Sequence, residues 1–229
     1  MAALSVMAQD SSRRKVGVLI SGRGSNLQSL IDACAKPDFP ARIALVISNK
    51  ADAYGLERAK QAGIATLVID HKKFSGRESF DAAIDAALRD AGCEFVCLAG
   101  FMRLLTAHFN AQWHDRMLNI HPSLLPAFKG LYTHERALDS GVRVTGCTVH
   151  VVRADMDAGP IVIQAAVPVL PDDTAETLAA RVLAAEHRIY PEALRLLAEG
   201  RIRVTGDIAI VDRAPVPAVT PLINPPPRD

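Results

Sequence analysis

The chain has 229 residues, of which 49% are apolar and 22% are charged, close to the average usage of globular proteins. This length fits one ordinary domain or two small ones and argues against a collagen, a small disulfide-bonded scaffold and a long repeat array. The 26 basic residues nearly balance the 25 acidic ones, so the net charge of +1 provides no strong field for a polyanion. No nucleic-acid partner is expected.

Cysteine usage is typical of a reducing compartment. The four cysteines, Cys34, Cys93, Cys97 and Cys147, are too few and too scattered for a disulfide framework. Cys93 and Cys97 have no matching second pair of Cys or His, which a zinc site would need. We therefore expect reduced, mostly buried thiols, no metal and a cytoplasmic protein.

Both ends of the sequence differ in composition from its middle. The N-terminal stretch has no basic residue ahead of its short apolar run, and no later apolar run reaches the roughly 18 residues of a membrane span. Residues 211–229 hold six of the fourteen prolines, which neither a helix nor a central strand tolerates. We expect one folded domain over 15–210, a disordered extension over 1–14, a proline-rich tail over 211–229 and no membrane partner.

Short β-branched runs alternate with helical patterns in the first hundred residues. Strands are predicted at residues 15–20, 42–48, 65–70 and 95–100, and helices at 25–35, 53–62 and 77–90. The unbroken apolar run of the fourth strand is typical of a strand covered on both faces. This alternation predicts an α/β fold with an open, mostly parallel twisted sheet and helices on both faces.

After residue 100 the pattern changes. A helix is predicted at 106–113, a strand at 117–121, a helix at 133–140, and two further strands at 142–152 and 160–169 with no helix between them. The short segment between the last two strands predicts a hairpin, so an antiparallel addition to the sheet is expected. A final helix is predicted up to Glu199, with Thr174 as its N-cap and Gly200 just beyond its end.

A glycine-containing loop, residues 21–26, joins the first predicted strand directly to a helix. Backbone amides and the helix dipole at such a junction favour an anion, and Ser25 and Asn26 add side-chain donors for a single phosphate group. Leu27 stands where a dinucleotide fingerprint needs its third glycine, and Asn49 stands where an NAD site places an acid. The alternative is that the glycines only form a tight turn.

Asn119 and His121 are two residues apart on the predicted strand 117–121, so their side chains leave the same face of the sheet. Pro122 ends the strand and places the pair at the carboxyl edge, where open α/β sheets bind ligands. An amide donor beside a group that titrates near neutrality suits a reaction that creates an oxyanion and moves a proton. An Asx turn next to a packed histidine is the alternative.

Two aspartates lie in the predicted hairpin loop. Asp155 and Asp157 match the first and third positions of a calcium loop, but Pro160 and Ala166 stand where an EF-hand needs glycine and glutamate. The aspartates are either turn-forming residues or the source of a carboxylate that polarises water or favours a charged imidazole nearby.

These motifs together resemble one known family. The segments ISGRGSNLQSLIDA, ISNKADAYGLERAKQAGI, LAGFMRLL, LNIHPSLLPAFKGLYTHERAL, GCTVHVVRADMDAGPIVIQAAVPV and AAEHRIYPEAL are similar to those of the folate-dependent phosphoribosylglycinamide formyltransferases, over about residues 15–205. IHPSLLP is shared by formyl-tetrahydrofolate enzymes in general, whereas SGRGSN and the AEH helix indicate this family. The resemblance implies a Rossmann-like fold and transfer of a formyl group from the co-substrate 10-formyltetrahydrofolate to the amine of phosphoribosylglycinamide, a step of purine synthesis that needs no metal.

The resemblance also implies roles for individual residues. The family's catalytic asparagine, histidine and aspartate correspond to Asn119, His121 and Asp157. Its phosphate loop corresponds to Gly24, Ser25 and Asn26, and the acid that holds the ribose hydroxyls corresponds to Glu186. Its folate pocket corresponds to Arg77, Met102, Arg103, Leu104 and Leu105, and to the backbone of Arg153, Ala154, Asp155, Met156 and Asp157.

Other functions are expected to fit less well. A formyltetrahydrofolate hydrolase normally carries an extra N-terminal domain, and a methionyl-tRNA formyltransferase an extra C-terminal RNA-binding domain, for which the sequence offers no candidate. A dinucleotide-dependent oxidoreductase is disfavoured by the glycine loop. A non-catalytic sensor of a phosphoribosyl ligand would have no use for Asn119, His121 and Asp157 together. We expect two small-molecule substrates as partners and a monomer or weak homodimer.

Overall fold

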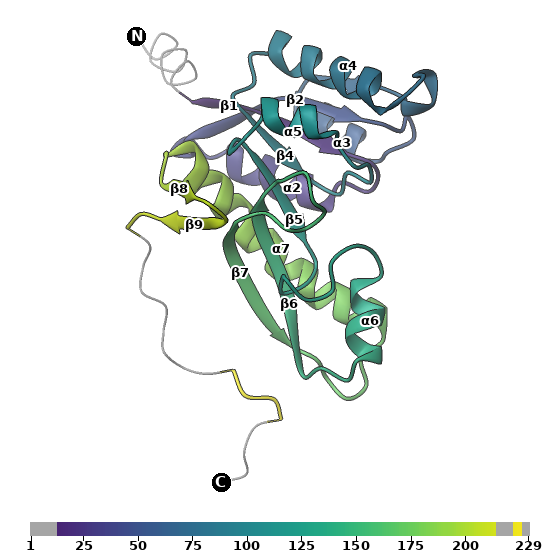
Figure 1. Cartoon of the computed structure of the whole chain (residues 1–229), viewed down its shortest axis with the longest axis vertical. Coiled ribbons are helices and arrows are strands. Elements are labelled where there is room, and N and C mark those ends of the chain that lie inside the picture. The colour runs from purple at the N-terminus through teal and green to yellow at the C-terminus, as the bar shows by residue number, and fades with distance from the viewer. Residues whose placement is uncertain (1–12, 214–221, 226–229) are drawn as a thin grey trace.

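The computed structural model describes residues 13–213 and 222–225, so most of the expected N-terminal extension and proline-rich tail lies outside the described residues. The main sheet contains β1 (Arg14–Ile20), β2 (Ala41–Ser48), β3 (Thr66–Val68), β4 (Phe95–Leu98), β5 (Met117–His121), β6 (Val144–Val151) and β7 (Ile161–Pro168). Its strand order is β3-β2-β1-β4-β5-β6-β7. Strands β1 to β5 pair in parallel, whereas β6 is antiparallel to both of its neighbours. The predicted parallel sheet with an antiparallel hairpin is confirmed (Figure 1).

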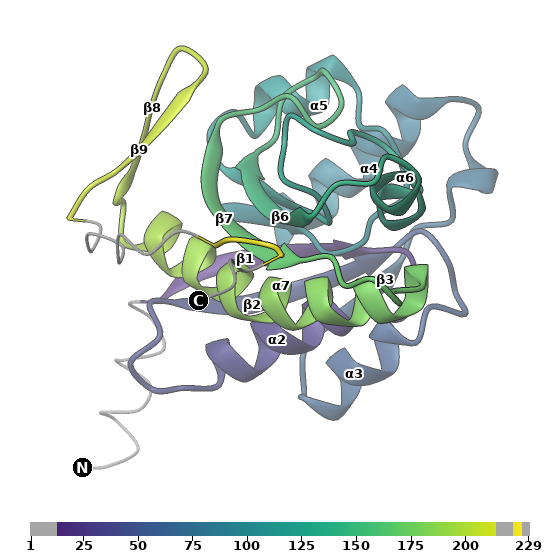
Figure 2. The ribbon, with the colours of Figure 1, turned by 90° about the horizontal axis from the view of Figure 1, so that it is seen from below.

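Helices cover both faces of this sheet. They are α2 (Ser25–Cys34), α3 (Gly55–Gln61), α4 (Arg77–Asp90), α5 (Ala107–Gln112), α6 (Thr133–Asp139) and α7 (Ala175–Ala198), with a short 3₁₀ helix η1 (His71–Lys73). Helices α2, α3 and α7 contribute to one buried apolar cluster, and α4 and α5 contribute to a second cluster on the opposite face. Figure 2 shows the sheet between these two layers.

Helix α7 fixes the central strands near the site. Its start is capped as predicted, because the Thr174 side chain accepts from the Thr177 amide while the Thr177 hydroxyl accepts from the Thr174 amide. Its buried Tyr190 hydroxyl donates to the carbonyl oxygen of Leu98 at 2.9 Å, and it also lies 3.3 Å from that of Leu118. The helix is thereby tied to both β4 and β5, the strands that lead to the candidate site.

The turn from β1 into α2 requires glycine at one position. Gly24 has a φ of 70°, in the left-handed region that side chains rarely adopt. A Cβ atom on Gly24 would lie 2.6 Å from the Cα atom of Gly55 at the start of α3. The predicted glycine loop is therefore a tight turn whose backbone packs directly against a neighbouring helix.

A second, smaller sheet was not predicted from the sequence. Strands β8 (Ile202–Thr205) and β9 (Ile208–Val211) form an antiparallel hairpin. Gly206, with a φ of 59°, and Asp207 connect them. A Gly-Asp pair between two alternating runs is a hairpin signal, so the sequence contained the information.

The structure also describes the state of the cysteines, the grouping of possible metal ligands and the character of the helices. All four cysteines are buried and unbonded, as predicted, and burial raises the pKa of Cys97 to about 12. Within 13–213 and 222–225, no three or more His, Cys, Asp or Glu side chains form a group that could hold a metal ion. No helix of the described ranges is long and apolar enough to cross a membrane.

Candidate active site

The three predicted catalytic residues lie together at the carboxyl edge of the sheet. Asn119 and His121 are on β5, and Asp157 is in the loop between β6 and β7. His121 Nδ1 lies 3.4 Å from Asp157 Oδ2, and both side chains are largely buried. Asn119 joins them through His150, whose Nε2 lies 3.1 Å from Asn119 Nδ2 and 3.8 Å from Asp157 Oδ1. Strand pairing and one loop therefore assemble a single polar cluster.

Asp157 is held by its own loop and by a neighbouring one. Its φ of 51° lies in the left-handed region, which is uncommon for a residue other than glycine. The Gly130 amide donates to Asp157 Oδ2 at 2.8 Å. The carboxylate therefore faces His121 from a fixed direction, and its functional role stays a prediction.

Both ring nitrogens of His121 face oxygen atoms. Nδ1 faces the Asp157 carboxylate, and Nε2 lies 3.0 Å from the carbonyl oxygen of Phe128. A neutral imidazole can donate from only one nitrogen, so only the protonated ring satisfies both acceptors.

His150 is a residue of this cluster that no motif in the sequence singled out. It lies directly opposite Asn119 in the β5–β6 pairing. Burial lowers the pKa of His150, which favours the neutral ring. Its Nδ1 lies 3.2 Å from the Val151 carbonyl and donates to it, which leaves Nε2 to accept from Asn119. His150 therefore fixes the orientation of the Asn119 amide, and only the strand register reveals this.

The glycine loop is connected by a hydrogen bond to Glu186, the residue expected to hold the ribose hydroxyls. Asn26 Nδ2, at the start of α2, donates to Glu186 Oε2 on α7 at 2.7 Å. Glu186 is buried, and burial raises the pKa of its carboxyl group. One of the two Asn26 amide protons is thus committed to Glu186, so Asn26 has less donor capacity for a phosphate than the sequence suggested. Gly24 and Ser25 directly precede it.

The loop 101–105 presents several of the expected folate-contacting residues. Met102 and Leu104 are 65% and 57% exposed. The Leu105 side chain instead packs in the apolar cluster with residues of α4 and α5 and is not exposed to a ligand. The loop ends at Thr106, whose amide donates to the buried carboxylate of Asp81 at 2.7 Å.

The remaining expected folate contacts come from the start of α4, from the loop 101–105 and from the loop between β6 and β7. Arg77 is exposed at the start of α4, and Arg103 is exposed in the loop 101–105. Met156 is exposed in the β6–β7 loop, whereas the Arg153 guanidinium is bonded to Asp115 Oδ1 at 2.5 Å. The contacts of Arg77, Met102, Arg103, Leu104, Leu105, Arg153, Ala154, Asp155 and Met156 with folate stay a prediction.

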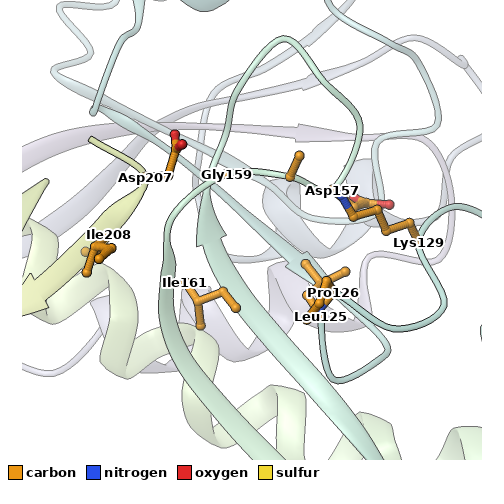
Figure 3. A pocket seen from close by; sticks show the side chains of 10 residues that line it. Leu125, Pro126, Lys129, Asp157, Gly159, Ile161, Asp207 and Ile208 are labelled. Carbon is orange, nitrogen blue, oxygen red and sulfur yellow. The ribbon is translucent and has the colours of Figure 1, made fainter. Parts of the chain in front are cut away.

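A cavity of about 380 Å³ opens beside Asp157. Its walls come from the loop after β5, the start of β7 and the tip of the β8–β9 hairpin, and are lined by Leu125, Pro126, Lys129, Asp157, Ala158, Gly159, Ile161, Asp207, Ile208 and Ala209. Figure 3 shows Asp157 and Lys129 on one side and the hairpin residues Asp207 and Ile208 on the other. The cavity was not predicted, because the hairpin that closes it was not.

Comparison with known proteins places the chain in a family. The profile of the formyl transferase family matches residues 14–194. The phosphoribosylglycinamide formyltransferase of Haemophilus influenzae is 47% identical over 204 residues, which cover 89% of this chain and 96% of that protein. The corresponding protein of Escherichia coli is 44% identical, covering 87% and 94% of the two chains. The chain belongs to the phosphoribosylglycinamide formyltransferase family.

Solved structures of family members share its architecture. Glycinamide ribonucleotide transformylase 1 from Symbiobacterium toebii superimposes with a TM-score of 0.86 at 52% identity, over 87% of this chain and 94% of that one.

A longer relative, the trifunctional purine biosynthetic protein adenosine-3 of Bos taurus, is 56% identical over 84% of this chain. The match covers only 19% of that protein, so the chain spans about a fifth of its length.

Proposed function

We propose that this protein transfers a formyl group from 10-formyltetrahydrofolate to the amine of N1-(5-phospho-D-ribosyl)glycinamide, giving formylglycinamide ribonucleotide and tetrahydrofolate. The observation that carries the proposal is the convergence of an amide, an imidazole and a carboxylate, with His121 Nδ1 3.4 Å from Asp157 Oδ2 and Asn119 joined to them through His150. The phosphoribosylglycinamide formyltransferases of Haemophilus influenzae and Escherichia coli, to which the chain is similar, support the choice of substrates.

The nucleophile needs little activation. An α-amino group has a pKa of about 7.7–8.0, so an appreciable fraction is neutral near pH 7 to 8. Its attack on the formyl carbon gives a tetrahedral species with a negative oxygen and a positive nitrogen. Asn119 and protonated His121 donate to this oxygen. Asn119 has one amide proton left after its bond to His150, and His121 Nε2 exchanges its bond to Phe128 for the oxyanion.

The proton that leaves the amine must reach the folate nitrogen. The bond between the formyl carbon and that nitrogen breaks as the nitrogen takes up the proton, so the folate leaves as a neutral amine. Either His121 gives its proton to the folate nitrogen and then takes up the proton of the amine, or a water held by Asp157 carries the proton between the two nitrogens. The Asp157 carboxylate faces His121 Nδ1 and stabilises the charged ring before and after this exchange.

Substrate positions follow from the two edges of the site. The phosphate lies against the backbone of Gly24, Ser25 and Asn26 at the start of α2, where amides and the helix dipole favour an anion. Glu186 accepts from the ribose hydroxyls. The folate lies against the loop 101–105, the loop 153–157 and Arg77.

Replacing Glu186 with glutamine should stabilise the protein near neutral pH and weaken binding of the ribosyl substrate. Burial raises the pKa of Glu186, so ionising this carboxyl group in the folded protein lowers the free energy of unfolding. This loss of stability is absent below the ordinary pKa of 4.5 and is complete once the pH has risen through the raised pKa. Glutamine keeps an acceptor for Asn26, so the melting temperature should rise by about 2–4 °C per kcal/mol of penalty removed. The KM for that substrate should rise about tenfold, since a charged acceptor is lost.

Thermal unfolding scans across pH check this expectation. The gain should be present near neutral pH and should vanish at about pH 4, where the carboxyl of the unmodified protein is protonated in both folded and unfolded states. An equal gain at both pH values would contradict the role assigned to the buried charge.

The experiment that tests the function is a turnover assay. Purified protein is incubated with 10-formyltetrahydrofolate, with and without phosphoribosylglycinamide, and the deformylated folate and the formylated nucleotide are both measured. The proposal predicts equal amounts of the two products, formed only when both substrates are present. Deformylation with water alone would indicate a hydrolase and would overturn the proposal.

A further inference from the structure

A chain of buried hydrogen bonds crosses the carboxyl ends of four neighbouring strands. Ser21 follows β1, Asn49 follows β2, His71 opens η1 beyond β3, and Met102 follows β4. The Ser21 hydroxyl donates to Asn49 Oδ1 at 2.6 Å and accepts from the Met102 amide at 2.8 Å. Asn49 Nδ2 lies 3.3 Å from His71 Nδ1. Ser21 is 5% and Asn49 2% exposed, so water does not compete for these bonds.

Asn49 sets the direction of the bonds. A hydroxyl group has one proton, and Ser21 donates it in the hydrogen bond to Asn49 Oδ1. This orientation turns a lone pair of the Ser21 oxygen toward the Met102 amide, from which it accepts. The other end of the Asn49 amide donates to His71 Nδ1, which fixes which side of the amide is oxygen. Without Asn49, the Ser21 proton has no fixed acceptor, so the orientation in which the Ser21 oxygen accepts from the Met102 amide is no longer held.

The chain joins two substrate-facing loops. Ser21 begins the phosphate loop 21–26, and Met102 lies in the loop 101–105 expected to contact folate. A second bond, from the Ser21 amide to the Gly100 carbonyl at 3.1 Å, reinforces the connection. The catalytic cluster on β5 and in the β6–β7 loop takes no part in this chain.

We propose that Ser21 and Asn49 are positioning residues that hold the phosphate loop and the loop 101–105 in register, so that the two substrates meet in the correct geometry. The assignment of a substrate to each loop rests on the proposed function. Because the reacting groups belong to other elements, loss of the chain lowers affinity for both substrates and leaves the chemical step nearly intact.

Steady-state kinetics of four variants test the proposal. Asn49→Ala and Ser21→Ala should each raise the KM of both substrates about tenfold, with kcat within about threefold of the unmodified protein, the pattern of lost binding common to ground and transition states. Asn49→Asp keeps an oxygen acceptor for Ser21 but loses the donor to His71 and buries a carboxyl group, so its KM should lie between those of the unmodified protein and Asn49→Ala. The double alanine variant should be no worse than either single one, because both remove the same connection.

Thr174→Ala is the matched control for stability. It removes one hydrogen bond at the start of α7, outside the candidate site. A merely destabilised enzyme loses active protein, which lowers apparent kcat and leaves KM unchanged, so the control should show no rise in KM. If Asn49→Ala behaved like Thr174→Ala, or raised the KM of one substrate alone, the proposal would be wrong.

Hydrogen exchange provides a readout that does not depend on the reaction. The Met102 amide should be protected in the unmodified protein and should exchange at least about tenfold faster in Asn49→Ala, while amides of β5 keep their protection. Unchanged exchange at Met102 would overturn the positioning role even if the protein formylated another substrate. If the turnover assay failed but the Met102 amide still exchanged faster in Asn49→Ala, the proposed substrates would be rejected. The connection between the two loops would then still be established.

Discussion

Replacing His121 with alanine should lower kcat by at least about 100-fold, the usual contribution of a positioned acid–base group. His121 is the only member of the proposed catalytic trio that faces both a carboxylate, Asp157, and a backbone carbonyl, that of Phe128. Alanine removes the donor to the oxyanion and the carrier of the proton at once. The measurement is kcat at saturating concentrations of both substrates.

Loss of folding must be separated from loss of chemistry in this variant. His121 is buried, so the melting temperature of the variant is measured beside its activity. His108→Ala, on the exposed side of α5, serves as the matched histidine control and should retain full activity. A folded His121→Ala protein with kcat within about threefold of the unmodified protein would reject the assigned role.

Replacing Asp157 with asparagine should also lower kcat by about 100-fold while preserving the loop. The asparagine oxygen can still accept from the Gly130 amide, which lies 2.8 Å from Asp157 Oδ2. The negative charge that faces His121 Nδ1 is lost, so the imidazolium form is no longer favoured. The KM of either substrate should change by less than about threefold, since the affected group acts on the transition state.

Asp212→Asn is the matched carboxylate control. Asp212 pairs with Arg203 on the exposed β8–β9 hairpin, and such surface pairs contribute little to stability. Its kcat should match that of the unmodified protein. An Asp157→Asn enzyme with normal kcat and a raised KM would show that the carboxylate binds substrate and does not support His121.

Much of the fold could be predicted because local patterns determine it. The alternation of apolar strands and amphipathic helices predicted the parallel sheet, and the absence of a helix between residues 152 and 160 predicted the antiparallel hairpin. The strand order could not be predicted, because it depends on which helices pack on which face. The β8–β9 hairpin was missed although Gly206 and Asp207 mark its turn.

The candidate site was predictable only in part. Asn119 and His121 share a face because strand periodicity requires it. The hairpin loop offered two candidate carboxylates, Asp155 and Asp157, and the choice of Asp157 depends on the resemblance to a family. His150 escaped notice because its partner Asn119 lies on another strand and is identified only by the register. From the sequence, Asn49 argues only against an NAD site. Its contact with Ser21 cannot be predicted locally, because it depends on β1 and β2 being neighbours in the sheet.

The double variant His121→Ala/Asp157→Asn tests the central claim most directly. If the aspartate acts through the histidine, the two substitutions remove the same contribution, and kcat of the double variant should lie within about threefold of the slower single variant. If the two groups contributed independently, their losses would multiply to about 10,000-fold. That result would contradict a single catalytic unit built from β5 and the β6–β7 loop.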